Sequence, residues 1–170
     1  KVIIGLSMVC SSAWVLFTPL QALRLCYRTS LFMQHQAGYN IEGCSRDEVN
    51  MTLGVQNHIT TTMDEMFKEG FGIDDKTLQK LIAKESWISS SEALFFGDRG
   101  VVDGIIAKEL RTEDYIVLTR EGYKRIDVNE VYNSGLLKRH RLLTEEECEE
   151  FGLKQHVPVP VGLKFPKAFA

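Results

Sequence analysis

The sequence lacks the features that mark nucleic-acid-binding and disordered proteins. It has no basic stripe or tail, and its 20 basic and 23 acidic residues give a net charge of −3. Nucleic acid is therefore not expected as the main partner. A composition of 44% hydrophobic and 25% charged residues is that of a soluble globular protein. The length of 170 residues allows one domain, or one domain with an appendage.

Cysteine is scarce, and its arrangement argues against a metal centre. The four cysteines are widely spaced, without a CxxC pair or another metal-ligand spacing, so neither a metal nor a cofactor is expected. Cys10 and Cys26 lie within apolar runs, where a free thiol behaves as a small hydrophobic group. This pattern is typical of a reducing compartment and favours the cytoplasm, while leaving a single disulfide open.

Charged residues are absent from Val2 to Leu23. Because about 20 apolar residues are enough to span a bilayer as a helix, this run fits a membrane segment, and it also fits a signal peptide. A proline, a glutamine and a serine pair interrupt it, and the Val-Ile-Ile content of the first ten residues favours a buried strand. A membrane-anchored or exported protein is thus the alternative to a cytoplasmic one.

Local patterns predict a chain that mixes strands and helices. Ser45, Ser89 and Thr144 are each followed three positions later by glutamate, which is the signature of a capped helix start. Helices are predicted from Ser11 to about Phe17, where Pro19 ends the helix, from Ser45 to about Glu69, near Asp74, and at residues 89–97 and 144–151. Strands are predicted for the first ten residues and for residues 23–27, 30–34, 100–106, 115–119 and 123–128, with an extended segment at 157–161.

A serine and a histidine each follow an apolar run, as the nucleophile and base of many serine hydrolases do. Ser11 is expected where a buried strand turns into a helix, whose first N–H groups would favour the charge of an oxyanion. His35 ends the second apolar run and is a candidate base for Ser11. A carboxylate is needed to fix the histidine tautomer, and the residue pattern alone does not choose it among 23 acids.

Three blocks of residues 1–106 resemble the Clp-type (ClpP) serine peptidases, and in detail their phage and prophage relatives that act as head-maturation proteases. Residues 10–16 (CSSAWVL) resemble the nucleophile block, and Arg24 with residues 31–36 (LFMQHQ) resembles the block that carries the histidine. Residues 85–97 (ESWISSSEALFFG), with Val101, Val102 and Asp103 after them, resemble the block that carries the acid.

The resemblance implies an α/β fold of the ClpP/crotonase type, built from stacked ββα units. It makes Ser11 the nucleophile, His35 the general base and Glu85 the acid, and it gives Ser12 an oxyanion-binding role through its backbone N–H. Residues 1–106 would be the C-terminal part of a peptidase domain, and residues 107–170 a small α+β extension of unknown role. The implied partners are a peptide or protein substrate, a homo-oligomeric ring contacted through the helix at residues 44–69, and an ATPase.

The chain also departs from the family pattern. Glu85 stands where these peptidases usually have aspartate, and Ser12 is an alternative nucleophile beside Ser11. The family's upstream strand and glycine-rich loop, which supply the second oxyanion donor, are missing before Lys1. The chain is therefore expected to be a fragment or to have lost an upstream segment.

Three other functions are compatible with parts of the sequence. A catalytically inactive subunit of the same fold would keep Ser11 and His35 without turnover. A signal-anchored interaction protein would use the first 23 residues only as a membrane segment. A crotonase acting on acyl-CoA would share the fold, but the sequence at residues 33–36 (MQHQ) argues against it.

Overall fold

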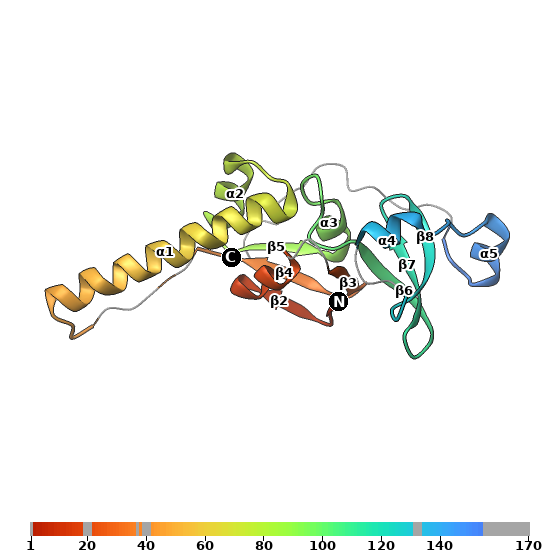
Figure 1. Cartoon of the computed structure of the whole chain (residues 1–170), viewed down its shortest axis with the longest axis horizontal. Helices are drawn as coiled ribbons and strands as arrows, with labels where there is room; N and C mark the ends of the chain where they lie inside the picture. The colour runs from red at the N-terminus through yellow and green to blue at the C-terminus, as the bar shows by residue number, and fades with distance from the viewer. Residues whose placement is uncertain (1, 19–21, 37, 39–41, 131–133, 155–170) are drawn as a thin grey trace.

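The computed structural model describes residues 2–18, 22–36, 38, 42–130 and 134–154 (Figure 1). The strands are β1 (Val2–Gly5), β2 (Met8–Cys10), β3 (Leu23–Tyr27), β4 (Leu31–Gln34), β5 (Ser86–Ser89), β6 (Gly104–Arg111), β7 (Asp114–Thr119) and β8 (Gly122–Asp127). The helices are the 3-10 helix η1 (Ser11–Phe17) and the α-helices α1 (Arg46–Phe71), α2 (Asp75–Ile82), α3 (Ser90–Phe95), α4 (Ser134–Arg139) and α5 (Glu145–Glu150). The predicted stop at Pro19 and the segment 157–161 lie outside the described residues.

The described strands form two sheets. One has five strands in the order β1-β3-β6-β7-β8, with the first three parallel and the last two antiparallel. The other has three strands in the order β2-β4-β5, in which β2 and β4 are parallel and β5 is antiparallel. The mixture of sheets and helices confirms the predicted α/β class.

The uncharged N-terminal run forms two strands, and the prediction of a single strand over the first ten residues was wrong. β1 pairs with β3 in one sheet, whereas β2 pairs with β4 in the other. The chain crosses between the sheets at Leu6 and Ser7, where the Ser7 carbonyl accepts a hydrogen bond from the Leu31 N–H (2.8 Å). Among the described residues, the structure has no helix that is both long enough and apolar enough to span a bilayer.

Trp14 of η1 is the centre of the larger hydrophobic core. Its side chain is fully buried, and its ring lies 5.9–6.2 Å between centroids from each of its aromatic neighbours, Phe32, Phe67, Phe71 and Phe96. Its indole N–H donates to the Val9 carbonyl (3.0 Å). Because the neighbours belong to β4, α1 and the end of α3, the core fixes η1 against both sheet and helices.

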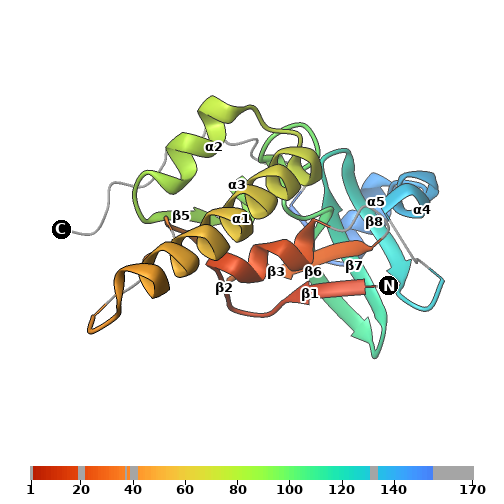
Figure 2. The same cartoon turned by 60° about the vertical axis from the view of Figure 1, so that its left-hand side comes forward.

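The helix α1 projects from the body of the molecule (Figure 1), and Figure 2 shows it passing beside η1, whose Trp14 packs against Phe67 of α1. As predicted, Ser45 caps it in a reciprocal box with Glu48, although the helix runs to Phe71 rather than Glu69. Its buried residues, Phe67, Gly70 and Phe71, all lie in the last two turns. The earlier turns contact little of the described chain, and Met51 and Val55 there are more than half exposed.

The C-terminal strands continue the five-stranded sheet. β6 spans the boundary that the sequence predicts at residue 106, and β7 and β8 follow it in antiparallel register. The strands predicted at residues 115–119 and 123–128 are confirmed. A second hydrophobic core lies on this side, formed by residues of β3, β6, β7, β8 and α4. Arg120, between β7 and β8, donates hydrogen bonds to the carbonyls of Leu94, Phe96, Gly97 and Asp98 and thus ties this part to the end of α3.

The strand predicted for residues 100–106 begins only at Gly104. Val101 and Val102 are buried, but the Val101 N–H donates to the carbonyl of Ala93 in α3 (2.8 Å), so its donor is not available to a strand. The positive φ of 74° at Gly100 turns the chain into this contact. Hydrophobicity identified the burial of this segment, but the turn at Gly100 and the hydrogen bond back to the preceding helix α3 determine its backbone.

Replacing Gly97 by alanine is expected to destabilise the fold strongly. Gly97 has a φ of 56°, and a Cβ there would lie 2.4 Å from the carbonyl oxygen of Phe71, which belongs to a helix end that cannot easily move. The free energy of unfolding should fall by about 2–5 kcal/mol, measured by denaturant unfolding. Gly54→Ala is the control, because nothing lies within 4 Å of a Cβ in the exposed middle of α1, and it should stabilise by about 1 kcal/mol. Equal effects of the two changes would contradict this packing.

Candidate active site

The register of the three-stranded sheet brings three predicted site residues to one edge. β2 and β4 are parallel, with Cys10 opposite Met33, so both strands end at the same side. β5 is antiparallel to β4, with Gln34 opposite Ser86, so β5 begins at that side. The residue after β2 is Ser11, the residue after β4 is His35, and the residue before β5 is Glu85.

Ser11 is the first residue of η1, and Ser12, the alternative nucleophile, is exposed in its first turn. The residue before them, Cys10, has extended backbone angles (φ −106°, ψ 136°) and makes no side-chain hydrogen bond to the first turn. The predicted change from strand to helix at this serine is therefore confirmed. The helix type, 3-10 rather than α, was not anticipated.

His35 is exposed, whereas Gln34 before it is buried, as strand alternation requires. The Nδ1 atom of His35 lies 2.7 Å from the backbone carbonyl of Gln36. A carbonyl only accepts hydrogen bonds, so this contact requires a proton on Nδ1 and, in the neutral ring, leaves Nε2 unprotonated. That is the tautomer that a general base for serine needs.

Glu85 is exposed at the start of β5, and its carboxylate accepts a hydrogen bond from the indole N–H of Trp87 (2.6 Å). Within the described part of the chain, no hydrogen bond or ion pair joins Glu85 to His35. The sheet thus brings the predicted acid and base to the same edge, but the bond between them is not formed in this structure. A triad would require Glu85 to exchange Trp87 for His35.

Sequence reasoning missed the groups that Glu85 and His35 contact here. Trp87 lies in the block that resembles the acid-bearing region but has no predicted role, and the Gln36 carbonyl carries no sequence signal. The strand β5 itself was not predicted, because Ser86–Ser89 is short and serine-rich. Its pairing with β4 was the missing information, since that pairing carries Glu85 to the edge where His35 lies.

Two cavities formed by the described residues have none of the predicted site residues in their lining. One pocket of about 460 Å³ lies between the end of α1, the 98–103 loop and the β7–β8 turn, and neither Ser11, His35 nor Glu85 lines it.

All four cysteines are free, so the disulfide left open by the sequence is absent. Burial raises the pKa of the Cys26 thiol to about 12, which makes this cysteine unsuitable as a nucleophile.

Comparison with known proteins identifies the family. No curated protein gives a significant match to the chain. A sequence profile described as Clp protease matches residues 1–109, which is more than half of the chain and includes every predicted site residue. The α/β architecture, with its two sheets and covering helices, agrees with this match. The chain therefore belongs to the Clp protease family.

Proposed function

We propose that this chain is a serine endopeptidase that hydrolyses peptide bonds through an acyl-enzyme on Ser11. His35 is the general base, Glu85 the acid that orients it, and the backbone N–H of Ser12 an oxyanion donor. The observation that supports this assignment is the register of β2, β4 and β5. Ser11 and His35 directly follow β2 and β4, and Glu85 directly precedes β5, all at one sheet edge. Membership of the Clp protease family supports peptidase chemistry in general.

The proposed steps of peptide hydrolysis begin with His35 in the tautomer that carries its proton on Nδ1. Its unprotonated Nε2 takes the proton of the Ser11 hydroxyl while the oxygen attacks the peptide carbonyl. The oxyanion of the tetrahedral intermediate accepts a hydrogen bond from the Ser12 N–H. His35 then gives its proton to the leaving amine, and water, activated in the same way, hydrolyses the acyl-enzyme.

Trp87 competes with His35 for the carboxylate of Glu85, and its removal is expected to raise activity. In Trp87→Phe the ring remains but the N–H that binds Glu85 is lost. The rate constant kcat for peptide hydrolysis should rise about five-fold, the equivalent of roughly 1 kcal/mol. The same substitution in a Glu85→Gln background should change nothing, because the carboxylate is gone. An equal effect in both backgrounds would mean that Trp87 acts by another route.

A catalytically inactive subunit of the same fold is the second candidate. The observation that favours it is the pairing of Glu85 with Trp87 and of His35 with Gln36, which leaves the predicted acid and base unconnected. In that case the residues at the sheet edge would be retained without turnover, and the chain would contribute structure to an assembly.

Labelling with a fluorophosphonate probe separates the two candidates. The probe reacts with a serine whose proton is removed by a positioned base, and it does not need a specific peptide. The full-length protein should be labelled, with the label lost after heat denaturation. Absence of label on both Ser11 and Ser12 in the folded full-length protein would favour the inactive subunit.

Assembly into a ring is part of the same proposal. Members of the Clp protease family typically form oligomeric rings and act on protein substrates. In this chain, Met51, Val55 and Ile59 lie at successive i, i+4 positions of α1 and are 68%, 55% and 45% exposed. Such an apolar stripe on a projecting helix supports a contact with further copies of the chain. The proposal also includes an ATPase partner and a cytoplasmic location. It further includes kinship with phage head-maturation proteases, which the sequence at residues 85–87 (ESW) supports.

A further inference from the structure

Arg24 is a buried charge in a strand that is otherwise apolar. It lies on β3 between Leu23 and Leu25, and only 8% of its side chain is exposed. Its partner Asp103 is 9% exposed. The guanidinium donates to both carboxylate oxygens, from Nη2 to Oδ1 (2.6 Å) and from Nε to Oδ2 (3.0 Å). A buried charge with a bidentate partner has most of its desolvation cost offset.

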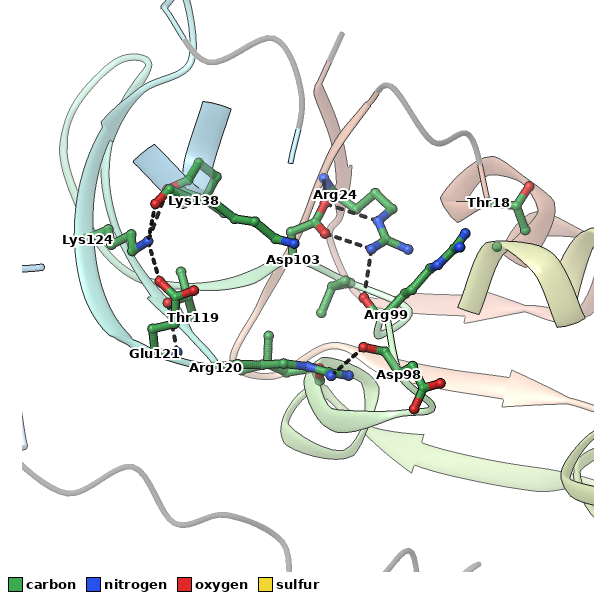
Figure 3. Close-up of a pocket in the computed structure, with 14 residues that line it drawn as sticks. Thr18, Arg24, Asp98, Arg99, Asp103, Thr119, Arg120, Glu121, Lys124 and Lys138 are labelled. Atoms are coloured by element: carbon green, nitrogen blue, oxygen red, sulfur yellow. Dashed lines mark hydrogen bonds and ion pairs between the residues drawn. The ribbon is translucent and has the colours of Figure 1, made fainter. Parts of the chain in front are cut away.

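The backbones of the same two residues are also joined. The Arg24 N–H donates to Asp103 Oδ2 (2.9 Å), and the Asp103 N–H donates to the Arg24 carbonyl (2.7 Å). The pair therefore fixes the start of β6 to β3 through both side chains and main chain. Figure 3 shows the two side chains facing one another at the wall of the 460 Å³ pocket.

The other guanidinium hydrogens of Arg24 reach two further segments. Nη2 donates to the Arg99 carbonyl (3.0 Å), and Nη1 donates to the Gly100 carbonyl (2.8 Å) and to the Phe17 carbonyl (3.1 Å). Phe17 is the last residue of η1, the helix that begins at Ser11. A single side chain thus connects the helix of the predicted nucleophile to the 99–103 loop.

The end of η1 is held from a second direction as well. Thr18, directly after the helix, packs against Gly70 of α1, where a Cβ would lie only 2.9 Å from the Thr18 Cβ. A 3-10 helix rises about 2 Å per residue, so Ser11 lies only a short distance along the seven-residue η1 from its anchored end. With Trp14 buried in the middle and Phe17 bonded at the end, the orientation of the first turn depends on these anchors.

We propose that Arg24 and Asp103 are a positioning pair, which holds the C-terminal end of η1 and so sets the placement of Ser11 for acylation. The inference rests on the proposed function, since it assigns a role toward the same serine. Neither residue contacts the reacting atoms. The pair acts through the Phe17 carbonyl and the seven-residue helix that ends there.

Arg24→Lys tests the pair, because lysine keeps the charge but cannot bind Asp103 bidentately and reach the Phe17 carbonyl together. Arg120→Lys is the matched control. Arg120 also binds backbone carbonyls and lines the same pocket, but its bonds go to Leu94 and residues 96–98, not to η1. Asp103→Asn is a second variant, which weakens the pair while leaving the Phe17 contact possible, and its effects should be smaller.

Two readouts are compared in the full-length protein. Hydrogen–deuterium exchange of the amides in residues 11–17 should accelerate at least about ten-fold in Arg24→Lys. The maximal rate of fluorophosphonate acylation should fall about 100-fold with little change in the half-saturating probe concentration, because misplacement affects the reaction more than binding. In Arg120→Lys neither readout should change.

Unchanged exchange at residues 11–17 in Arg24→Lys would overturn the inference. So would equal changes in both readouts for Arg24→Lys and Arg120→Lys, because the effect would then be general loss of stability. If the unmodified protein is not labelled at all, the proposed function fails. The exchange comparison still decides whether the pair holds η1.

Discussion

Replacing Ser11 by alanine should abolish peptide hydrolysis. We expect kcat to fall by about 10⁴- to 10⁶-fold, because the hydroxyl that forms the acyl-enzyme is lost while binding groups remain. The serine begins η1, whose core residue Trp14 is fully buried, so an alanine there should leave the fold intact. The measurement is the initial rate of cleavage of a fluorogenic peptide, with circular dichroism as the check on folding.

Ser12→Ala is the matched control for this change. Ser12 is exposed in the same turn, and its proposed contribution is a backbone N–H that alanine keeps. Its rate should stay within about ten-fold of the unmodified protein. If Ser12→Ala is the inactive variant and Ser11→Ala is active, the nucleophile is Ser12 and the assignment of Ser11 is wrong.

Replacing His35 by alanine should lower kcat about as much as the loss of Ser11. The two groups act as one unit, so the double variant Ser11→Ala/His35→Ala should be no slower than either single variant. His35 is exposed, and within the described residues its ring hydrogen-bonds to the adjacent Gln36 carbonyl, so stability should change little.

His58→Ala provides the control for removing a histidine. His58 is exposed on α1 and is not one of the proposed catalytic residues, so its loss should leave kcat unchanged. Additive losses for Ser11 and His35, each on the order of ten-fold, would indicate two independent contributions. That result would contradict a base that activates the serine.

Local signals predicted the helices well. The boxes at Ser45–Glu48, Ser89–Glu92 and Thr144–Glu147 all form, because each is built within four residues of one chain segment. The strand β5 and the break between β1 and β2 were not predicted. Both depend on which strands pair, and pairing partners lie far apart in the sequence.

The residues of the candidate site differ in the same way. The apolar runs before Ser11 and His35 predict these two residues, whereas Glu85 is predicted by the family resemblance and not by a local pattern. The hydrogen bond from Trp87 to Glu85 depends on side-chain placement that no spacing encodes. Arg24 did carry a signal, because a charge within an apolar strand requires a buried partner. Which acid supplies that partner became visible only in the fold.

The most direct test of the central claim is to trap the acyl-enzyme. The full-length protein is mixed with a slowly hydrolysed activated peptide ester, quenched in acid and digested, and the adduct is located by mass spectrometry. The proposed function predicts the acyl mass on Ser11, absent in both Ser11→Ala and His35→Ala. An adduct on another residue, or no adduct while the peptide ester is turned over, would contradict a serine peptidase that acts through Ser11.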